Sequence, residues 1–260
     1  MTVATRVYRD YLQRGRLAEL ERLLVRALEL GYESKTLSAF AADPGAGERV
    51  LLLRHDIDSD VPRARRMWEI ERRAGVAGSW FFRRSTWDVP FMRELASAGC
   101  DVGYHYEELS TLIKQRGAAT GEAARTLIDP ARERLRAALA ELRAGSGLPL
   151  DLLASHGDFA NRAVDVSNVE LLDDRAFRAE VGGRLEAYDH HDHVDFRATD
   201  GADGRGRWWP ADPLDALGRG ARVVELLVHP RAWGASPLVN ARQDLERLVE
   251  GARYALRRRA

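Results

Sequence analysis

A run of four apolar residues that leads into two carboxylates constrains the possible fold of this chain more than any other sequence feature. The run covers residues 50–53, and Asp56 and Asp58 follow it. Such a short run is typical of a strand buried on both faces of a parallel sheet, from whose C-terminal end alternate residues point the same way. Two adjacent carboxylates repel each other unless a cation or a shared proton lies between them, which favours a metal site. The alternative is a polar strand end, with Asp58 capping a helix that begins near Val61.

Four more apolar runs predict buried strands, and helical periodicity lies between them. The runs are 77–82, 100–104, 150–155 and 223–228, with shorter strands expected near 179–181 and 195–198. Strands that alternate with helices favour an α/β domain built on a parallel sheet or barrel. We therefore expect a barrel domain over 48–260, preceded by a helical extension over 1–47 that packs on it.

Composition excludes several partners. The 260 residues include 40 Lys and Arg against 40 Asp and Glu, so the formal net charge of zero gives no indication of a nucleic-acid or acidic-membrane partner. No apolar run approaches the roughly 20 residues that a membrane helix needs. The N-terminus leads directly into a charged amphipathic segment without an apolar signal core, so we expect a cytoplasmic protein.

Histidines follow three of the predicted strands. Each lies at the C-terminal end of its strand, as Asp56 and Asp58 lie at the end of the first one. They are His105, His156 and His229. The C-terminal ends of the strands of a parallel barrel converge on one face, where such folds carry their active sites. A metal-ligand set drawn from several strand ends is therefore expected.

These motifs, in this order, resemble the polysaccharide deacetylase superfamily, within a divergent branch whose first motif is Arg-His-Asp-x-Asp. The matching segments are 53–58, 102–107, 155–157, 198–201 with Trp208, and 226–230. The resemblance implies a distorted (β/α)7-type barrel and a metal-dependent hydrolase. Its expected substrate is an N- or O-acetylated carbohydrate, small or carrier-linked, from which a metal-bound water removes the acetyl group.

The resemblance also implies roles for individual residues. Asp56 would be the catalytic base, Asp58 and His105 metal ligands, and His229 the general acid. One divalent ion is expected, zinc before cobalt, nickel or manganese. Such an ion acidifies its bound water and polarises the acetyl carbonyl, while a carboxylate takes the proton and a histidinium protonates the leaving group.

Two departures from the family pattern affect the site. Leu109 stands where a further ligand His is usual, so the site must find a replacement, accept a water or be empty. His156 and Glu107 are the candidate replacements, with Glu108 a weaker one. The usual Arg-Pro-rich stretch that holds the base is absent. Arg54 is a possible substitute, although adjacent residues on a strand face opposite ways. A catalytically degenerate barrel that binds carbohydrate or acts as a scaffold is therefore the alternative function.

The remaining candidates are aromatic or lie in a histidine-rich loop. Trp208 and Trp233 are candidates for stacking on a sugar ring, with Asp200 in the same substrate-binding set, although Trp is more often core. Residues 189–195 contain three His and three Asp, for which we favour a solvated loop over a Zn²⁺ or Ni²⁺ site. His55 alternates with Asp56 and is expected to face the helix layer in a structural role.

Overall fold

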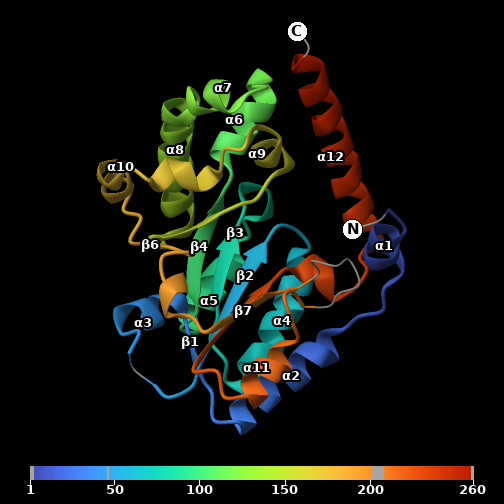
Figure 1. The fold of residues 1–260 in the computed structure, drawn as a ribbon, viewed down its shortest axis with the longest axis vertical. Helices are drawn as coiled ribbons and strands as arrows, with labels where there is room; N and C mark the ends of the chain where they lie inside the picture. Colours follow the sequence, from blue (N-terminus) through green and yellow to red (C-terminus); the bar gives the residue numbers. More distant parts are fainter. Residues whose placement is uncertain (1–2, 46, 201–207, 259–260) are drawn as a thin grey trace. The chain divides into compact units, whose positions relative to one another are not determined.

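The computed structural model describes residues 3–45, 47–200 and 208–258. The chain forms two compact units, of which the first comprises Met1–Gly103 with Tyr188–Asn240 and the second Tyr104–Ala187 with Ala241–Ala260 (Figure 1). Both contain parallel strands and helices, which confirms the α/β class. Closure into a seven-stranded barrel, and the expected domain boundary at residue 48, stay predictions.

The first unit contains most of the strands. Its elements are α1 (Val3–Val7), a π-helical turn (Tyr8–Leu12), α2 (Leu17–Glu29), β1 (Glu33–Lys35), α3 (Leu37–Ala42), β2 (Val50–Ile57), α4 (Val61–Ala74), β3 (Ser79–Phe82), a 3₁₀ turn (Arg84–Thr86), α5 (Val89–Ser97), the start of β4 (Asp101–Tyr106), a 3₁₀ turn (His191–His193), β7 (Phe196–Thr199), α11 (Pro213–Gly218), β8 (Val223–Val228), a 3₁₀ turn (Pro230–Trp233) and the start of α12 (Pro237–Arg257).

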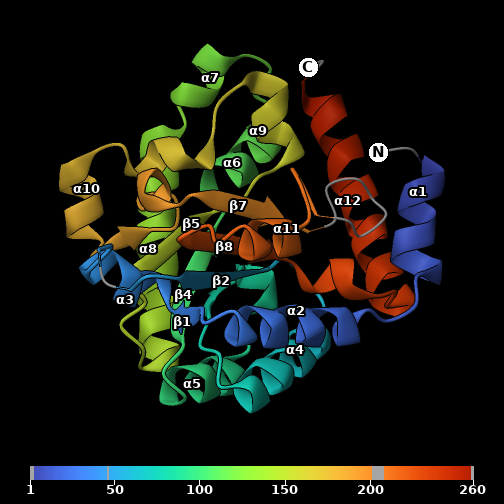
Figure 2. The same ribbon diagram turned by 60° about the horizontal axis from the view of Figure 1, so that its bottom comes forward.

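Strand β2 is the centre of the first unit. It pairs in parallel with β3 on one side and β8 on the other, β8 pairs with β7, and β4 begins beside β3. Every residue of β2 is buried. Figure 2 shows β7, β8 and β2 side by side in a curled half-barrel that is compatible with a (β/α) barrel. Because these strands are parallel, β2, β7 and β8 end at the same edge.

Helix α4 starts immediately after the acidic end of β2. Asp60 is its N-cap, in the left-handed conformation at φ 54°, and its side chain accepts the amide N–H of Arg63. Pro62 lies in the first turn, and Gly75, at φ 71°, ends the helix. The cap is therefore Asp60, so the alternative in which Asp58 caps this helix is wrong.

The N-terminal segment is an integral part of the first unit. It contributes β1, which pairs in parallel with β2, so the expectation of a purely helical extension was incomplete. The Ser34 hydroxyl donates to the carbonyl of Ala77 at 2.8 Å, and the N–H of Leu37 donates to Ser79 Oγ at 2.8 Å. Helix α2 buries one apolar face and lies alongside α4 (Figure 2).

The second unit is built on three parallel strands, with β5 between β4 and β6. Its elements are the remainder of β4, α6 (Glu108–Arg116), α7 (Gly121–Arg125), α8 (Ile128–Ser146), β5 (Leu152–Ser155), α9 (Phe159–Val164), a 3₁₀ turn (Asn168–Leu172), α10 (Arg175–Glu180), β6 (Leu185–Glu186) and the remainder of α12.

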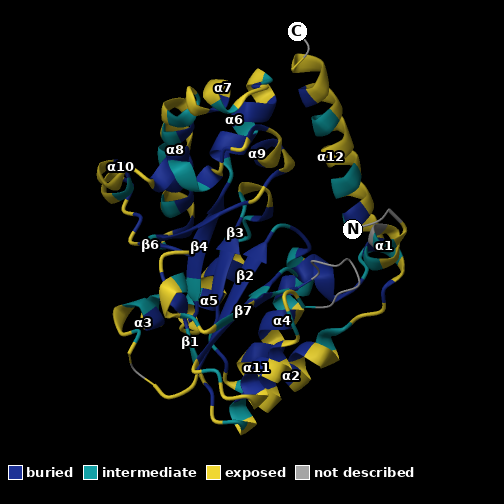
Figure 3. Ribbon diagram, in the orientation of Figure 1, coloured by how far each residue is buried: buried dark blue, intermediate teal, exposed yellow. Residues whose placement is uncertain are grey.

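The prediction of a strand near 179–181 is wrong, because helix α10 covers most of these residues. The Asp174 side chain caps this helix by accepting the N–H groups of Ala176 and Phe177, and the Phe177 side chain is buried. Figure 3 shows that the strands are largely buried and that much of α12 is exposed. Within the described part of the chain, no helix combines the length and apolar character that crossing a membrane requires.

Candidate active site at the ends of strands β2, β7 and β8

Asp56 lies near the end of β2 and is held by an arginine from the same strand. Arg54 Nε donates to Oδ1 of Asp56 and Arg54 Nη2 donates to Oδ2, each at 2.9 Å. Both side chains are buried. Burial alone would lower the pKa of Arg54, but the Asp56 carboxylate raises it well above its ordinary value, so the guanidinium stays charged.

The alternation argument against Arg54 was wrong. Arg54 and Asp56 are two positions apart, so their side chains lie on the same face of the strand. The residue between them, His55, points the other way and lies 2.9 Å from Glu71 of α4 through its Nε2. Its ring is stacked on Trp80, with centroids 3.6 Å apart, which agrees with a structural role facing the helix layer.

Asp200 joins the end of β7 to the residues that follow β8. Its Oδ2 accepts the backbone N–H of His229 at 2.7 Å and the indole N–H of Trp233 at 2.7 Å. Its Oδ1 lies 2.8 Å from His229 Nδ1. A carboxylate can only accept, so Nδ1 of His229 carries a proton and Nε2 is the nitrogen left for chemistry.

The surroundings of His229 favour its protonated form. Burial by itself lowers the pKa of this imidazole, but the ion pair with Asp200 outweighs burial, and the charges of Asp58 and Asp56 add to it. Together they raise the pKa of His229 to about 9. The side chain is 28% exposed, so solvent reaches it. The first unit therefore brings Asp56, Asp58, Asp200 and His229 within electrostatic reach of one another.

The tryptophans differ in exposure. Trp233 is only 2% exposed, and its indole N–H is used by Asp200, which favours the core role that was its alternative. Trp208 is half-buried and lies edge-on to Trp233, with centroids 5.8 Å apart. The neighbouring Trp209 is 63% exposed. Gly201, part of the 198–201 motif, lies outside the described residues.

In the second unit, His105 and His156 lie together at the ends of β4 and β5. Their rings are edge-to-face with centroids 5.1 Å apart, and both residues are buried. Nδ1 of His105 donates to the carbonyl of Ala154 at 2.9 Å, so its Nε2 carries the lone pair. Metal-binding histidines commonly use their second nitrogen in this way, so His105 fits a ligand role.

Glu107 lies beside His156 in the second unit. Its Oε2 lies 3.7 Å from His156 Nδ1, and Glu107, His156 and Asp158 form a group that could hold a metal ion. Glu108, by contrast, accepts from the Tyr104 hydroxyl and the Glu107 N–H, and burial raises its pKa to about 7. Leu109 is fully buried in α6. Asp58 belongs to the first unit and these groups to the second, so a ligand set that they share stays a prediction.

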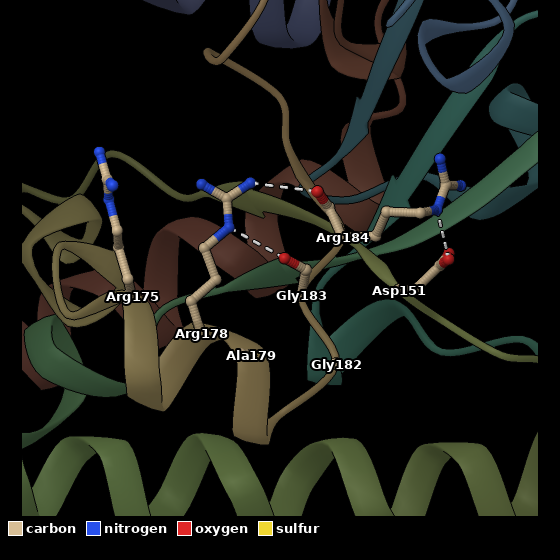
Figure 4. Close-up of a pocket in the computed structure, with 7 residues that line it drawn as sticks. All are labelled: Asp151, Arg175, Arg178, Ala179, Gly182, Gly183 and Arg184. Carbon is tan, nitrogen blue, oxygen red and sulfur yellow. Dashed lines mark hydrogen bonds and ion pairs between the residues drawn. The ribbon is translucent and has the colours of Figure 1, made fainter. Parts of the chain in front are cut away.

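A surface pocket in the second unit contains none of the predicted site residues. Figure 4 shows three arginines around it. Arg178 donates to the carbonyls of Gly183 and Arg184, and Arg184 Nε donates to Asp151 at 2.6 Å. Because these donors are used within the fold, the pocket is a poor candidate for the site.

The histidine-rich loop is not uniformly solvated as expected. Asp189, Asp192 and His193 are exposed, but His190 is 3% exposed. Nε2 of His190 and Nε2 of His191 each lie 3.4 Å from Glu225 Oε2. Burial would raise the pKa of Glu225, but the two imidazoles and Arg54 lower it to about 2.

Scans against protein-family models, curated proteins and solved structures find no match for this chain. The resemblance to polysaccharide deacetylases therefore depends on the motifs and on the site chemistry. Sequence reasoning missed that Asp200 is the partner of His229. The adjacency of β7 and β8, whose ends carry these two residues, is the signal that could have found it.

Proposed function

We propose that the chain is a metal-dependent hydrolase that removes an acetyl group from an N- or O-acetylated carbohydrate. In this reaction the oxygen of water bonds to the acetyl carbon, and the C–N or C–O bond to the sugar breaks to release acetate. The observation that carries the proposal is the Asp200–His229 pair beside Asp56 and Asp58. It supplies a proton donor and carboxylates at one edge of the sheet.

Asp56 is the proposed base. Both of its oxygens accept hydrogen bonds from Arg54, which fixes the carboxylate in one orientation. Arg54 thereby replaces the absent Arg-Pro-rich motif as the partner of the base. A fixed carboxylate can take a proton from water without the entropic cost of orienting its side chain first. The bidentate pair thus supports the assignment that the alternation argument had weakened.

His229 is the proposed acid. Asp200 fixes its Nδ1 and favours the imidazolium, so Nε2 can protonate the departing amine or alkoxide. Asp200 is therefore a positioning residue, because all three of its described donors come from the 229–233 segment.

A divalent ion, zinc in the first place, would be held by Asp58 of the first unit with His105 and either His156 or Glu107 of the second. This shared ligand set is part of the proposal and derives from the strand-end argument. When bound, such an ion polarises a carbonyl and acidifies water. The Nδ1–H of His105 bound to Ala154 supports its role as an Nε2 ligand.

The test separates metal binding from turnover. Protein without a His-tag is analysed for bound metal and for acetate release from a panel of N- and O-acetylated sugars. Asp58→Ala should lose one metal equivalent and all turnover. Asp56→Asn should keep that equivalent and lose about 10²–10⁴-fold in kcat. Asp192→Ala, which removes an exposed carboxylate, serves as the control.

Two results would contradict the proposal. Equal metal loss in the Asp56 and Asp58 variants would overturn the division of roles between them. A wild-type chain without an Asp58-dependent metal equivalent would favour the carbohydrate-binding alternative. That alternative has one observation in its favour, since the fully buried Leu109 replaces a ligand histidine.

A further inference from the structure

The strongest unassigned feature of the molecule is the contact between the histidine-rich loop and strand β8. Glu225 is near the start of β8, four residues before His229, which corresponds to about 13 Å along a strand. The cluster therefore does not include the proposed acid, and none of its three residues is assigned to the proposed active site. It lies wholly within the first unit.

The cluster contains buried polar atoms that protein groups leave unsatisfied. His190 and Glu225 are each 3% exposed. Within the described residues, both ring nitrogens of His190 and Oε2 of Glu225 make no hydrogen bond, although the imidazoles lie at ion-pair distance from the carboxylate. A buried polar group without a hydrogen bond destabilises the fold, so such a cluster points to a missing ligand.

The spacing of the donor atoms matches that of a zinc site. One atom from each of His190, His191 and Glu225 lies within 4.8 Å of the other two, and both Nε2–Oε2 distances are 3.4 Å. Bonds of about 2.0–2.1 Å in a tetrahedron put neighbouring ligand atoms about 3.4 Å apart. Two imidazoles and a carboxylate are also a donor set that zinc accepts.

We propose that His190, His191 and Glu225 bind Zn²⁺, with water as the fourth ligand. The ion would attach the loop that follows β6 to strand β8. This proposal does not depend on the proposed hydrolase function, because none of its three ligands takes part in that chemistry.

One side chain competes with the ion. Arg197 Nη1 contacts both ring nitrogens of His191, with 3.0 Å to Nε2. Arg197 is exposed, so it can move into solvent when zinc binds. Removing this positive charge should therefore strengthen zinc binding, which is opposite to the effect of removing a ligand.

The experiment uses the full chain without a His-tag and with Asp58→Ala, so that the proposed active-site equivalent is absent. Zn²⁺ binding is measured by equilibrium dialysis with elemental analysis, and the melting temperature is recorded with and without Zn²⁺. We expect one equivalent and a higher melting temperature with the metal. Adding His191→Ala or Glu225→Gln should weaken binding by about tenfold or more.

Two further variants make the result specific. His193→Ala removes an exposed histidine of the same loop and should leave affinity unchanged, whereas Arg197→Ala should raise it. His191 is partly exposed, so its variant should fold even if the Glu225 variant does not. The proposal is overturned if the His191-dependent equivalent is absent, or if His193→Ala weakens binding as much as His191→Ala.

Discussion

A single carboxylate, Asp200, organises the region around the proposed acid. It accepts the backbone N–H and the ring Nδ1–H of His229, and the indole N–H of Trp233. These three donors fix the carboxylate against the 229–233 segment. The place of Asp200 in the substrate-binding set stays a prediction, and its role in positioning His229 is part of the proposal above.

Asp200→Asn should lower the pKa of His229 from about 9 towards the ordinary histidine value, because the ion pair with Asp200 is the largest effect that raises it. Titration of the imidazole by NMR in metal-free protein measures this change. The control is Asp192→Asn, which removes an exposed carboxylate and should leave the titration unaltered. An unchanged midpoint in Asp200→Asn would contradict the pairing.

The same pair predicts how stability depends on pH. The pKa of His229 is higher in the folded protein than the ordinary value near 6.5, so its protonation stabilises the fold fully below about pH 6.5. That contribution is lost as the pH rises towards 9. Urea denaturation of metal-free protein at pH 6 and pH 9 should show a larger decline for wild type than for Asp200→Asn, and equal declines would refute this linkage.

The buried Arg54–Asp56 pair should be costly to break. Arg54→Met leaves the Asp56 carboxylate buried without its guanidinium, which we expect to lower the free energy of unfolding by about 3–5 kcal/mol. Arg26→Met, in an exposed pair with Glu29, should change it by less than about 1 kcal/mol. Chemical denaturation compares the two, and similar losses would show that the buried pair contributes little.

At the scale of elements, apolar runs predicted the central strands well. The run at 223–228 matches β8, and 195–198 lies one residue from β7. The elements and residue pairs that depend on long-range contacts were predicted less well. Strand β1 is only three residues long and is stabilised by pairing with β2, which local pattern does not reveal. The Arg54–Asp56 pair lies within one strand and follows from strand alternation. The Asp200–His229 pair depends on the register between β7 and β8, which joins residues distant in sequence.

The N-terminal elements should contribute substantially to stability. Phe40 of α3 is completely buried, so Phe40→Ala should destabilise the chain by about 3–5 kcal/mol through loss of apolar burial and the cavity left behind. Phe159→Ala, at a residue that is 36% exposed, should cost about 1 kcal/mol. Thermal or urea unfolding measures both, and a small loss at Phe40 would mean that the 1–47 segment packs weakly.

For the molecule as a whole, charge balance predicts its colloidal behaviour. The 40 basic and 40 acidic residues cancel, and the sequence isoelectric point is about 7.1. Net charge opposes association, so solubility should be lowest near pH 7 and rise on either side. Light scattering across pH 5–9 at low salt tests this, and a minimum far from neutrality would indicate that buried groups shift the overall titration.

The placement of Arg54 has a consequence for communication within the first unit. Its guanidinium binds Asp56 directly, and the charge of Glu225 also acts on it. Any event that changes the charge at Glu225, including cation binding, therefore alters how strongly Arg54 holds Asp56. Such coupling is reciprocal, so protonation of Asp56 must change the affinity at Glu225 by the same free energy. One internal arginine thus makes the two acidic sites thermodynamically dependent on each other.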